Sequence, residues 1–139
     1  MKFEYRKEKS DILNYIYRPI IEVEFKNSEK GITIPEILYF DSGADITLIP
    51  RSTGELLELE IKNDEIKEIR GVGGGIVPVI VKKLNLSLCN YEFEARIAWA
   101  LIEDVPLLLG RTDVFKYFDF YINEEKLYVE VKLKNKYKK

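Results

Sequence analysis

The sequence predicts an all-β fold, and three observations support this prediction. Short stretches alternate between apolar and polar residues, as strands with one buried face do; Ile21, Val23 and Phe25, for example, alternate with charged side chains. Turn-forming Gly, Asn and Pro residues separate these stretches at short intervals. Residues 51–61 alone, in the first two-thirds of the chain, have a helical pattern. Short strands joined by frequent turns are typical of a β-barrel or a β-sandwich.

The first half of the chain is expected to contain four strands and one short helix. Proline cannot donate a hydrogen bond to a strand ladder, so Pro35 should interrupt its strand with a break or a bulge. Ser52 and Thr53 are the candidate caps of the helix. The expected strands are residues 2–6, 20–26, 32–40 and 46–50.

The second half of the chain is expected to form three hairpins. The segment between the second and third, residues 103–118, combines an apolar strand, a Gly-Arg turn and a short helix from Thr112. The expected hairpins are residues 63–88 with a glycine-rich tip, residues 84–101 around a turn at Cys89-Asn90, and residues 118–133 around a turn at 123–126.

Length and charge limit the classes of protein and partner. The chain has 139 residues, which fits one domain (1–139) with an N-terminal extension or strand at 1–19 and a solvated basic tail at 132–139. The net charge of -2 favours neither nucleic acid nor a membrane as a partner. No apolar run approaches the length that spans a bilayer, and the charged N-terminus is unlike a signal peptide.

The composition also bears on the cellular setting and the available chemistry. Cys89 is the only cysteine, so we expect no internal disulfide, a small buried thiol and a reduced, cytoplasmic location. Abundant Lys, Glu and Ile without Gln suit a thermophile, and an AT-rich genome gives a similar bias. The chain has no histidine, which excludes Ser-His-Asp and Cys-His catalysis and most histidine-based metal sites. Chemistry must therefore use carboxylates, Lys, Tyr, Ser or the backbone.

The glycine-rich segment at residues 71–75 is not a nucleotide-binding loop. A dinucleotide fingerprint that starts at Gly71 requires a third glycine where Ile76 stands, followed by a helix, whereas a β-branched segment follows here. No Gly-Lys-Ser/Thr follows either. The segment is either a tight hairpin turn that uses positive φ angles or a mobile loop that closes over a ligand.

Asp41 lies in a turn between two apolar strands. A carboxylate there lowers the stability of the fold unless it is hydrogen-bonded, and a functional role is the other reason to keep it. It could cap an Asx turn and have no further role. Alternatively, two carboxyl groups held close together share one proton, so that one acts as a base and the other as an acid. Since the chain contains one Asp-Ser-Gly, the second carboxyl would come from another copy across a two-fold axis.

Three motifs give the chain a resemblance to the retropepsin-like (retroviral-type) aspartic proteases, which include cellular prokaryotic members. They are apolar-Asp-Ser-Gly-Ala-Asp at Tyr39–Asp45, a glycine-rich flap at Ile69–Val77, and apolar-Gly-Arg before a short helix at Leu107–Phe115. The resemblance extends from Ile20 to Val131. It implies a closed, single-lobed acid-protease-type β-barrel of the cellular prokaryotic type, with one short helix in the C-terminal half after Gly110-Arg111.

The resemblance also assigns roles by position. Asp41 would be the catalytic carboxylate, and Ser42 and Gly43 would support its loop. Arg111 would form an ion pair with Asp45, for which a guanidinium fork is better suited than an ammonium group. The positions that would bind substrate are Gly43, Ala44, Asp45, Gly71, Val72, Gly73, Gly74 and Leu108.

The function implied is that of a homodimeric aspartic endopeptidase, which hydrolyses peptides or proteins with water activated between two Asp41 carboxyls. It needs no metal and no cofactor. The alternative is a dimeric module of the same fold that binds peptides or a partner protein without cutting them. A carboxylate-based glycosidase is a third option, for which no Asp or Glu pair stands out by its spacing.

Overall fold

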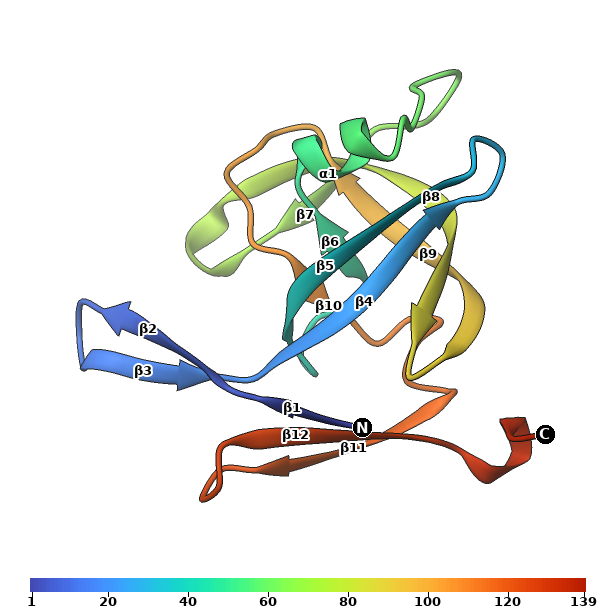
Figure 1. Ribbon diagram of the computed structural model, residues 1–139. Helices are drawn as coiled ribbons and strands as arrows, with labels where there is room; N and C mark the ends of the chain where they lie inside the picture. The colour runs from blue at the N-terminus through green and yellow to red at the C-terminus, as the bar shows by residue number, and fades with distance from the viewer.

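A closed β-barrel dominates the structure, which is a computed structural model that describes residues 1–139 (Figure 1). The strands follow one another around the barrel in the order β4-β5-β10-β6-β9-β8, and a β4–β8 pairing closes it. β7 (Lys67–Arg70) extends the sheet beyond β8. The predicted closed barrel is therefore confirmed. The six barrel strands are β4 (Ile20–Asn27), β5 (Ile32–Phe40), β6 (Thr47–Ile49), β8 (Ile76–Leu88), β9 (Tyr91–Ala100) and β10 (Leu108–Leu109).

Alternation along the barrel strands builds the main core. In β4, Ile21, Val23 and Phe25 are buried, whereas Glu22 and Glu24 point outward. Because successive side chains of a strand point to opposite faces, this pattern fixes which face of β4 lines the barrel. Burial of each such apolar side chain contributes about 1.5–3 kcal/mol. No helix of the structure has the length and apolarity needed to cross a membrane.

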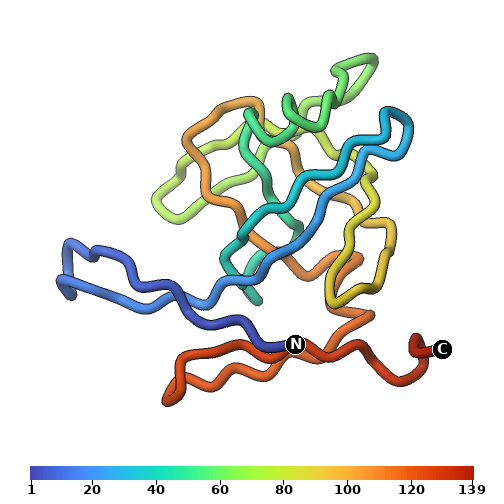
Figure 2. Tube along the Cα trace, in the orientation of Figure 1, coloured from blue at the N-terminus to red at the C-terminus, as the bar shows by residue number.

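The two ends of the chain pair with each other in a second sheet. β1 (Lys2–Glu4), β12 (Tyr128–Leu133) and β11 (Phe118–Asn123) form this sheet in that order, and it lies below the barrel in Figures 1 and 2. The Met1 amino group donates to the Val131 carbonyl at 2.9 Å. The N-terminal extension is also more structured than the sequence indicates, since β2 (Arg6–Ser10) and β3 (Asn14–Arg18) form a separate hairpin.

Three local expectations differ from the structure. β5 runs through Pro35 without a break. On the side of β5 away from β4 its partner is β10, which pairs only with Tyr39 and Phe40, so no strand on that side needs a hydrogen bond from Pro35. The basic tail is ordered in part, since Tyr137 in the short 3-10 helix η2 (Asn135–Tyr137) packs edge-on against Tyr117. Cys89 is only half-buried at the β8–β9 turn, where burial raises the pKa of its thiol.

The helix of the first half is α1 (Arg51–Leu56), and Pro50, rather than Ser52 or Thr53, occupies its N-cap position. The Ser52 hydroxyl instead donates to the Glu103 carboxylate at 2.7 Å. Gly54 lies directly against the Trp99 indole, so that any side chain there would clash with it. Helix α1 is therefore placed by packing on β9 and by contacts to residues 101–103 more than by its own capping.

The helix expected after Gly110-Arg111 is not formed. Residues 112–117 make successive turns, because Asp113 adopts a left-handed φ of 63° that ends helical winding after one turn. Arg96 on β9 holds Asp113 in this conformation. Its Nε and Nη2 donate to the two Asp113 carboxylate oxygens at 2.8 and 3.1 Å, and its backbone N–H donates at 3.0 Å. A contact that is remote in sequence therefore overrides the local helical preference.

The Arg96–Asp113 pair predicts a loss of stability in acid. Hydrogen bonds from Arg96 lower the pKa of Asp113 from 3.8 to about 2, so the pair stabilises the fold above pH 3.8 and this contribution is lost as the pH falls towards about 2. Asp113→Asn should unfold in urea with a smaller pH dependence across this window than the wild type. In a double-mutant cycle with Arg96→Ala the two losses should not add, and additive losses would show that the pair is not coupled.

Candidate active site

The Asp41 loop, residues 41–46, is held where three strands meet. β10 is parallel to the end of β5, with Leu109 opposite Phe40, and antiparallel to β6, with Leu108 opposite Leu48. The loop leaves β5 and enters β6, and therefore passes over the end of β10. Because β5 and β10 end side by side, Asp41 and the Gly110-Arg111 segment are neighbours although they are far apart in sequence.

Gly110 makes this junction possible through a close backbone approach. A Cβ atom at Gly110 would overlap the carbonyl group of Ile46, so only glycine fits there without a backbone shift. The Gly110 N–H is buried and donates to the Thr47 hydroxyl at 3.0 Å. Thr47 has no exposed surface. The sequence reasoning missed this role of Thr47, because a threonine in a short apolar strand has no distinctive signal.

Asp41 uses one of its carboxylate oxygens within its own loop. Oδ1 accepts the Gly43 N–H at 2.9 Å, which forms the Asx turn that the sequence allowed. The Ala44 N–H donates to the Asp41 carbonyl at 3.1 Å and tightens the same turn. The second oxygen, Oδ2, accepts no hydrogen bond from the chain, and Asp41 is partly exposed. One face of the carboxylate is therefore fixed and the other is available to a ligand.

Arg111 holds the Asp41 loop from the outside with its whole guanidinium fork. Nη1 donates to the Ser42 carbonyl at 2.7 Å and Nη2 donates to the Asp45 carboxylate. The backbone adds two bonds, from the Arg111 N–H to the Ala44 carbonyl at 3.0 Å and from the Thr112 N–H to the Asp45 carbonyl at 2.9 Å. Ser42 is exposed, and most of the Asp45 side chain faces solvent.

The glycine-rich segment forms the tip of a hairpin between β7 and β8, here called the flap hairpin (residues 67–79). A 3-10 turn, η1 (Val72–Gly74), makes the tip, and the Gly71 N–H closes it by donating to the Gly75 carbonyl at 2.8 Å. Gly73 and Gly74 have φ angles of 82° and 83°, which a side chain would strain. The Val72 side chain is fully exposed.

A small apolar cluster, separate from the main core, joins the flap hairpin to the strands below the Asp41 loop. Its buried members are Leu48, Val79, Ala98 and Ala100. Partly buried apolar side chains pack against it from both elements. They are Ile46, Ile69, Val77, Val105 and Leu108. The structure therefore brings Leu108 and the flap hairpin onto one apolar surface, whereas the sequence did not indicate Ile46 or Val105.

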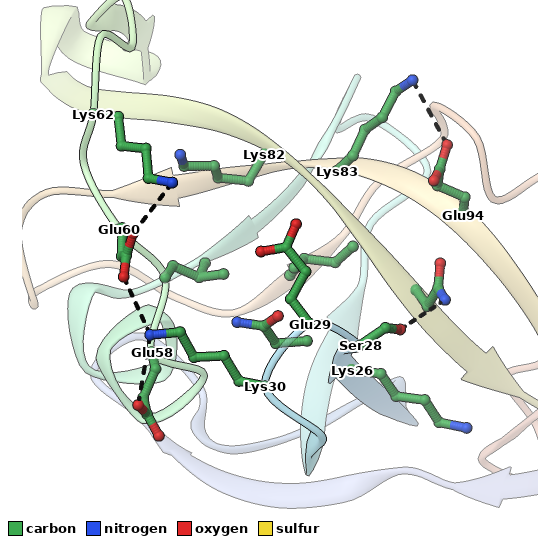
Figure 3. Close-up of a pocket in the computed structure, with 14 residues that line it drawn as sticks. Lys26, Ser28, Glu29, Lys30, Glu58, Glu60, Lys62, Lys82, Lys83 and Glu94 are labelled. Carbon is green, nitrogen blue, oxygen red and sulfur yellow. Dashed lines mark hydrogen bonds and ion pairs between the residues drawn. The ribbon is translucent and has the colours of Figure 1, made fainter.

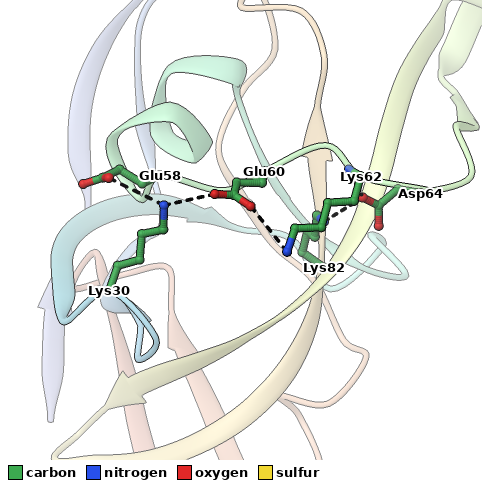
Figure 4. Close-up of polar contacts among 6 residues, drawn as sticks. All are labelled: Lys30, Glu58, Glu60, Lys62, Asp64 and Lys82. Atoms are coloured by element: carbon green, nitrogen blue, oxygen red, sulfur yellow. Dashed lines mark hydrogen bonds and ion pairs between the residues drawn. The ribbon is translucent and has the colours of Figure 1, made fainter.

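A hollow lined mainly by charged and polar side chains lies elsewhere on the surface (Figure 3). Lys30 and Lys62 contact Glu60, and Lys82 contacts Asp64 at 2.8 Å, so the lysine charges are largely paired (Figure 4). None of the sequence-predicted site residues lines this hollow. No group of His, Cys, Asp or Glu side chains is arranged to hold a metal ion. The Asp41 loop is thus the better candidate for a site.

Arg111→Lys tests the guanidinium fork. An ammonium group cannot reach the Ser42 carbonyl and the Asp45 carboxylate together, so we expect a loss of about 1 kcal/mol in the free energy of unfolding. Amide hydrogen exchange in residues 42–46 should also become faster. Arg70→Lys, at an exposed position whose nearest carboxylate is 3.6 Å away, is the matched control and should change neither. Equal effects of the two changes would rule out a special role for the fork.

Comparison with known proteins gives the fold. No protein-family model and no curated protein matches the chain. Among solved structures 225 chains match. One is the EIAV protease complexed with the inhibitor HBY-793, with 24% sequence identity and a TM-score of 0.52 over 68% of this chain and 82% of that chain. The chain is thus similar in fold to a retroviral protease.

Proposed function

We propose that the chain is an aspartic endopeptidase that acts as a homodimer, with one Asp41 from each copy. The observation that carries this proposal is the Asp41 carboxylate, whose Oδ1 is fixed by the Gly43 N–H while Oδ2 is free of hydrogen bonds. The fold similarity to a retroviral protease supports it. The cellular prokaryotic type of the family, a cytoplasmic location and the absence of a metal or cofactor are finer parts of the same proposal.

A second copy is required because one carboxyl cannot act as the acid and the base in one step. Two Asp41 side chains that meet across a two-fold axis would share a single proton. The two-fold axis would pass beside the exposed Ser42 and Gly43. Arg111 holds the loop from within its own chain, so each copy can present a preformed loop to the other.

In the proposed reaction, water lies between the two carboxyls. The ionised Asp41 takes a proton from the water while the protonated Asp41 donates its proton to the carbonyl oxygen of the peptide bond. The water oxygen bonds to the carbonyl carbon and gives a tetrahedral diol. One carboxyl then passes a proton to the nitrogen while a hydroxyl of the diol returns its proton to the other carboxylate; the C–N bond breaks, an acid and an amine leave, and the pair again holds one shared proton. Because one shared proton is required, the rate should show a bell-shaped dependence on pH.

The substrate would lie between the Asp41 loop and the flap hairpin. The Val72 and Gly73 N–H groups, which donate to no carbonyl group of the chain, would be offered to an extended peptide, and the Gly43 carbonyl would accept a hydrogen bond from it. Leu108 and the apolar cluster shared by the two elements favour hydrophobic side chains beside the cleaved bond.

A peptide-binding module without catalysis is the second candidate. The Asx turn at Asp41 favours it, because that hydrogen bond alone could explain why an aspartate is present. Under this function the free Oδ2 would have no chemical role, and replacing Asp41 by Asn would leave peptide binding unchanged.

Asp41→Asn separates the two candidates. The amide oxygen can still accept the Gly43 N–H, so the fold should remain, while peptide cleavage should fall by at least about a thousand-fold. A peptide library is incubated with the wild type and the variant at several pH values, with the oligomeric mass measured in the same buffers. Asp104→Asn, outside the Asp41 loop, is the control. Cleavage that survives in Asp41→Asn would disprove the mechanism.

Two neighbouring glycines of the flap hairpin test whether the conformation of its tip matters for cleavage. Gly74→Ala places a side chain at a φ of 83°, at a cost of about 1–2 kcal/mol to the tip, whereas Gly75 has a φ of -62° and nothing within 4 Å. We expect Gly74→Ala to lower kcat/KM by about tenfold and Gly75→Ala to leave it near the wild-type value. If both changes have the same effect on kcat/KM, the tip conformation does not matter for cleavage.

A further inference from the structure

The hairpin of β2 and β3, here called the arm (residues 6–18), pairs with no other strand. It leaves the barrel beside the end of β5 and extends away from it (Figures 1 and 2). Its base is attached through Tyr39, whose hydroxyl donates to Glu8 at 2.7 Å and whose ring lies 3.9 Å from the Arg18 guanidinium carbon. A two-stranded hairpin alone is only marginally stable in water, so an arm of this kind calls for a covering surface.

The tip of the arm exposes apolar side chains on an ordered turn. Ile12 is 90% exposed and Leu13 is 66% exposed. The Ser10 hydroxyl oxygen accepts the N–H groups of both residues, at 3.3 and 3.1 Å, and so orders the turn. Tyr15 and Tyr17 add two more exposed rings on one face of the arm. No other part of the chain covers these apolar side chains.

Position and charge indicate what covers the arm. Tyr39 lies two residues before Asp41, and the Phe40 N–H donates to the Pro19 carbonyl at 3.0 Å, so the arm starts beside the loop that must meet a second copy. The arm carries more basic than acidic side chains, whereas the whole chain has a net charge of -2. A basic arm and an acidic body are complementary between two identical copies.

We propose that the arm packs on the body of a second copy and secures the pair in which the two Asp41 side chains meet. The contact is reciprocal, because a two-fold axis gives each arm the same contact on the other copy. Ile12 and Leu13 are the apolar anchors, and Tyr15 and Tyr17 extend the contact towards the base. The choice of a second copy rests on the proposed function, whose Asp41 site is incomplete in one chain.

The test removes the apolar tip. The dimer dissociation constant is measured by sedimentation equilibrium for the wild type, for Ile12→Ser/Leu13→Ser, and for the control Ile61→Ser/Ile66→Ser, which alters two other exposed isoleucines. We expect the tip variant to raise the constant at least about tenfold, a change worth 1.4 kcal/mol, and the control to leave it unchanged. Peptide cleavage by the tip variant should recover at high protein concentration. Equal constants in all three proteins, or a wild type that stays monomeric, would overturn the proposal.

The two proposals fail in different ways. If the wild type dimerises through the arm but cleaves no peptide, the proposed protease function is refuted and the proposed role of the arm is supported. If the wild type cleaves peptides and the tip variant has the same dimer dissociation constant, the arm proposal alone is refuted. The wild type and the tip variant are also tested for binding to phosphatidylserine vesicles and to polyuridine. If the tip variant loses such binding while its dimer dissociation constant is unchanged, the arm belongs to another partner and the proposal is overturned.

Discussion

The close approach of Gly110 to the backbone at Ile46 is the constraint on which the site depends. Gly110 is buried, so its N–H must find an acceptor, and the Thr47 hydroxyl supplies it. This contact brings the end of β10 beneath the Asp41 loop and places Arg111 where its fork reaches the Ser42 carbonyl and the Asp45 carboxylate. A side chain at Gly110 would push apart the two segments that orient Asp41.

The sequence predicted well those features that depend on neighbours in the chain. Alternation in β4 gave its buried face directly, since the side-chain period of a strand is fixed by its backbone. The turn at Cys89-Asn90 was also predictable, and both residues adopt positive φ angles there. The fold class followed from many such segments, because each indicated the same short strands and turns.

Features that depend on distant partners were not predictable. The segment from Thr112 has a helical pattern, but Arg96, on another strand, holds Asp113 in a left-handed conformation. Pro35 should break a ladder, yet whether a ladder exists beside it depends on the length of β10. Thr47 became a site residue only when Gly110 was placed against it. In each case the deciding contact joins residues far apart in sequence.

The strand β8 belongs to both the flap hairpin and the barrel, and this limits how the flap hairpin can move. Its first residues pair with β7 in the flap hairpin, its last residues pair with β4 to close the barrel, and Val79 is the position that pairs with both β7 and β9. The flap hairpin therefore has no separate hinge loop on this side and can move only by bending a continuous strand. Beyond Val79 the rest of β8 is fixed in the barrel wall, so the stiffness of the barrel limits how far the flap hairpin can bend.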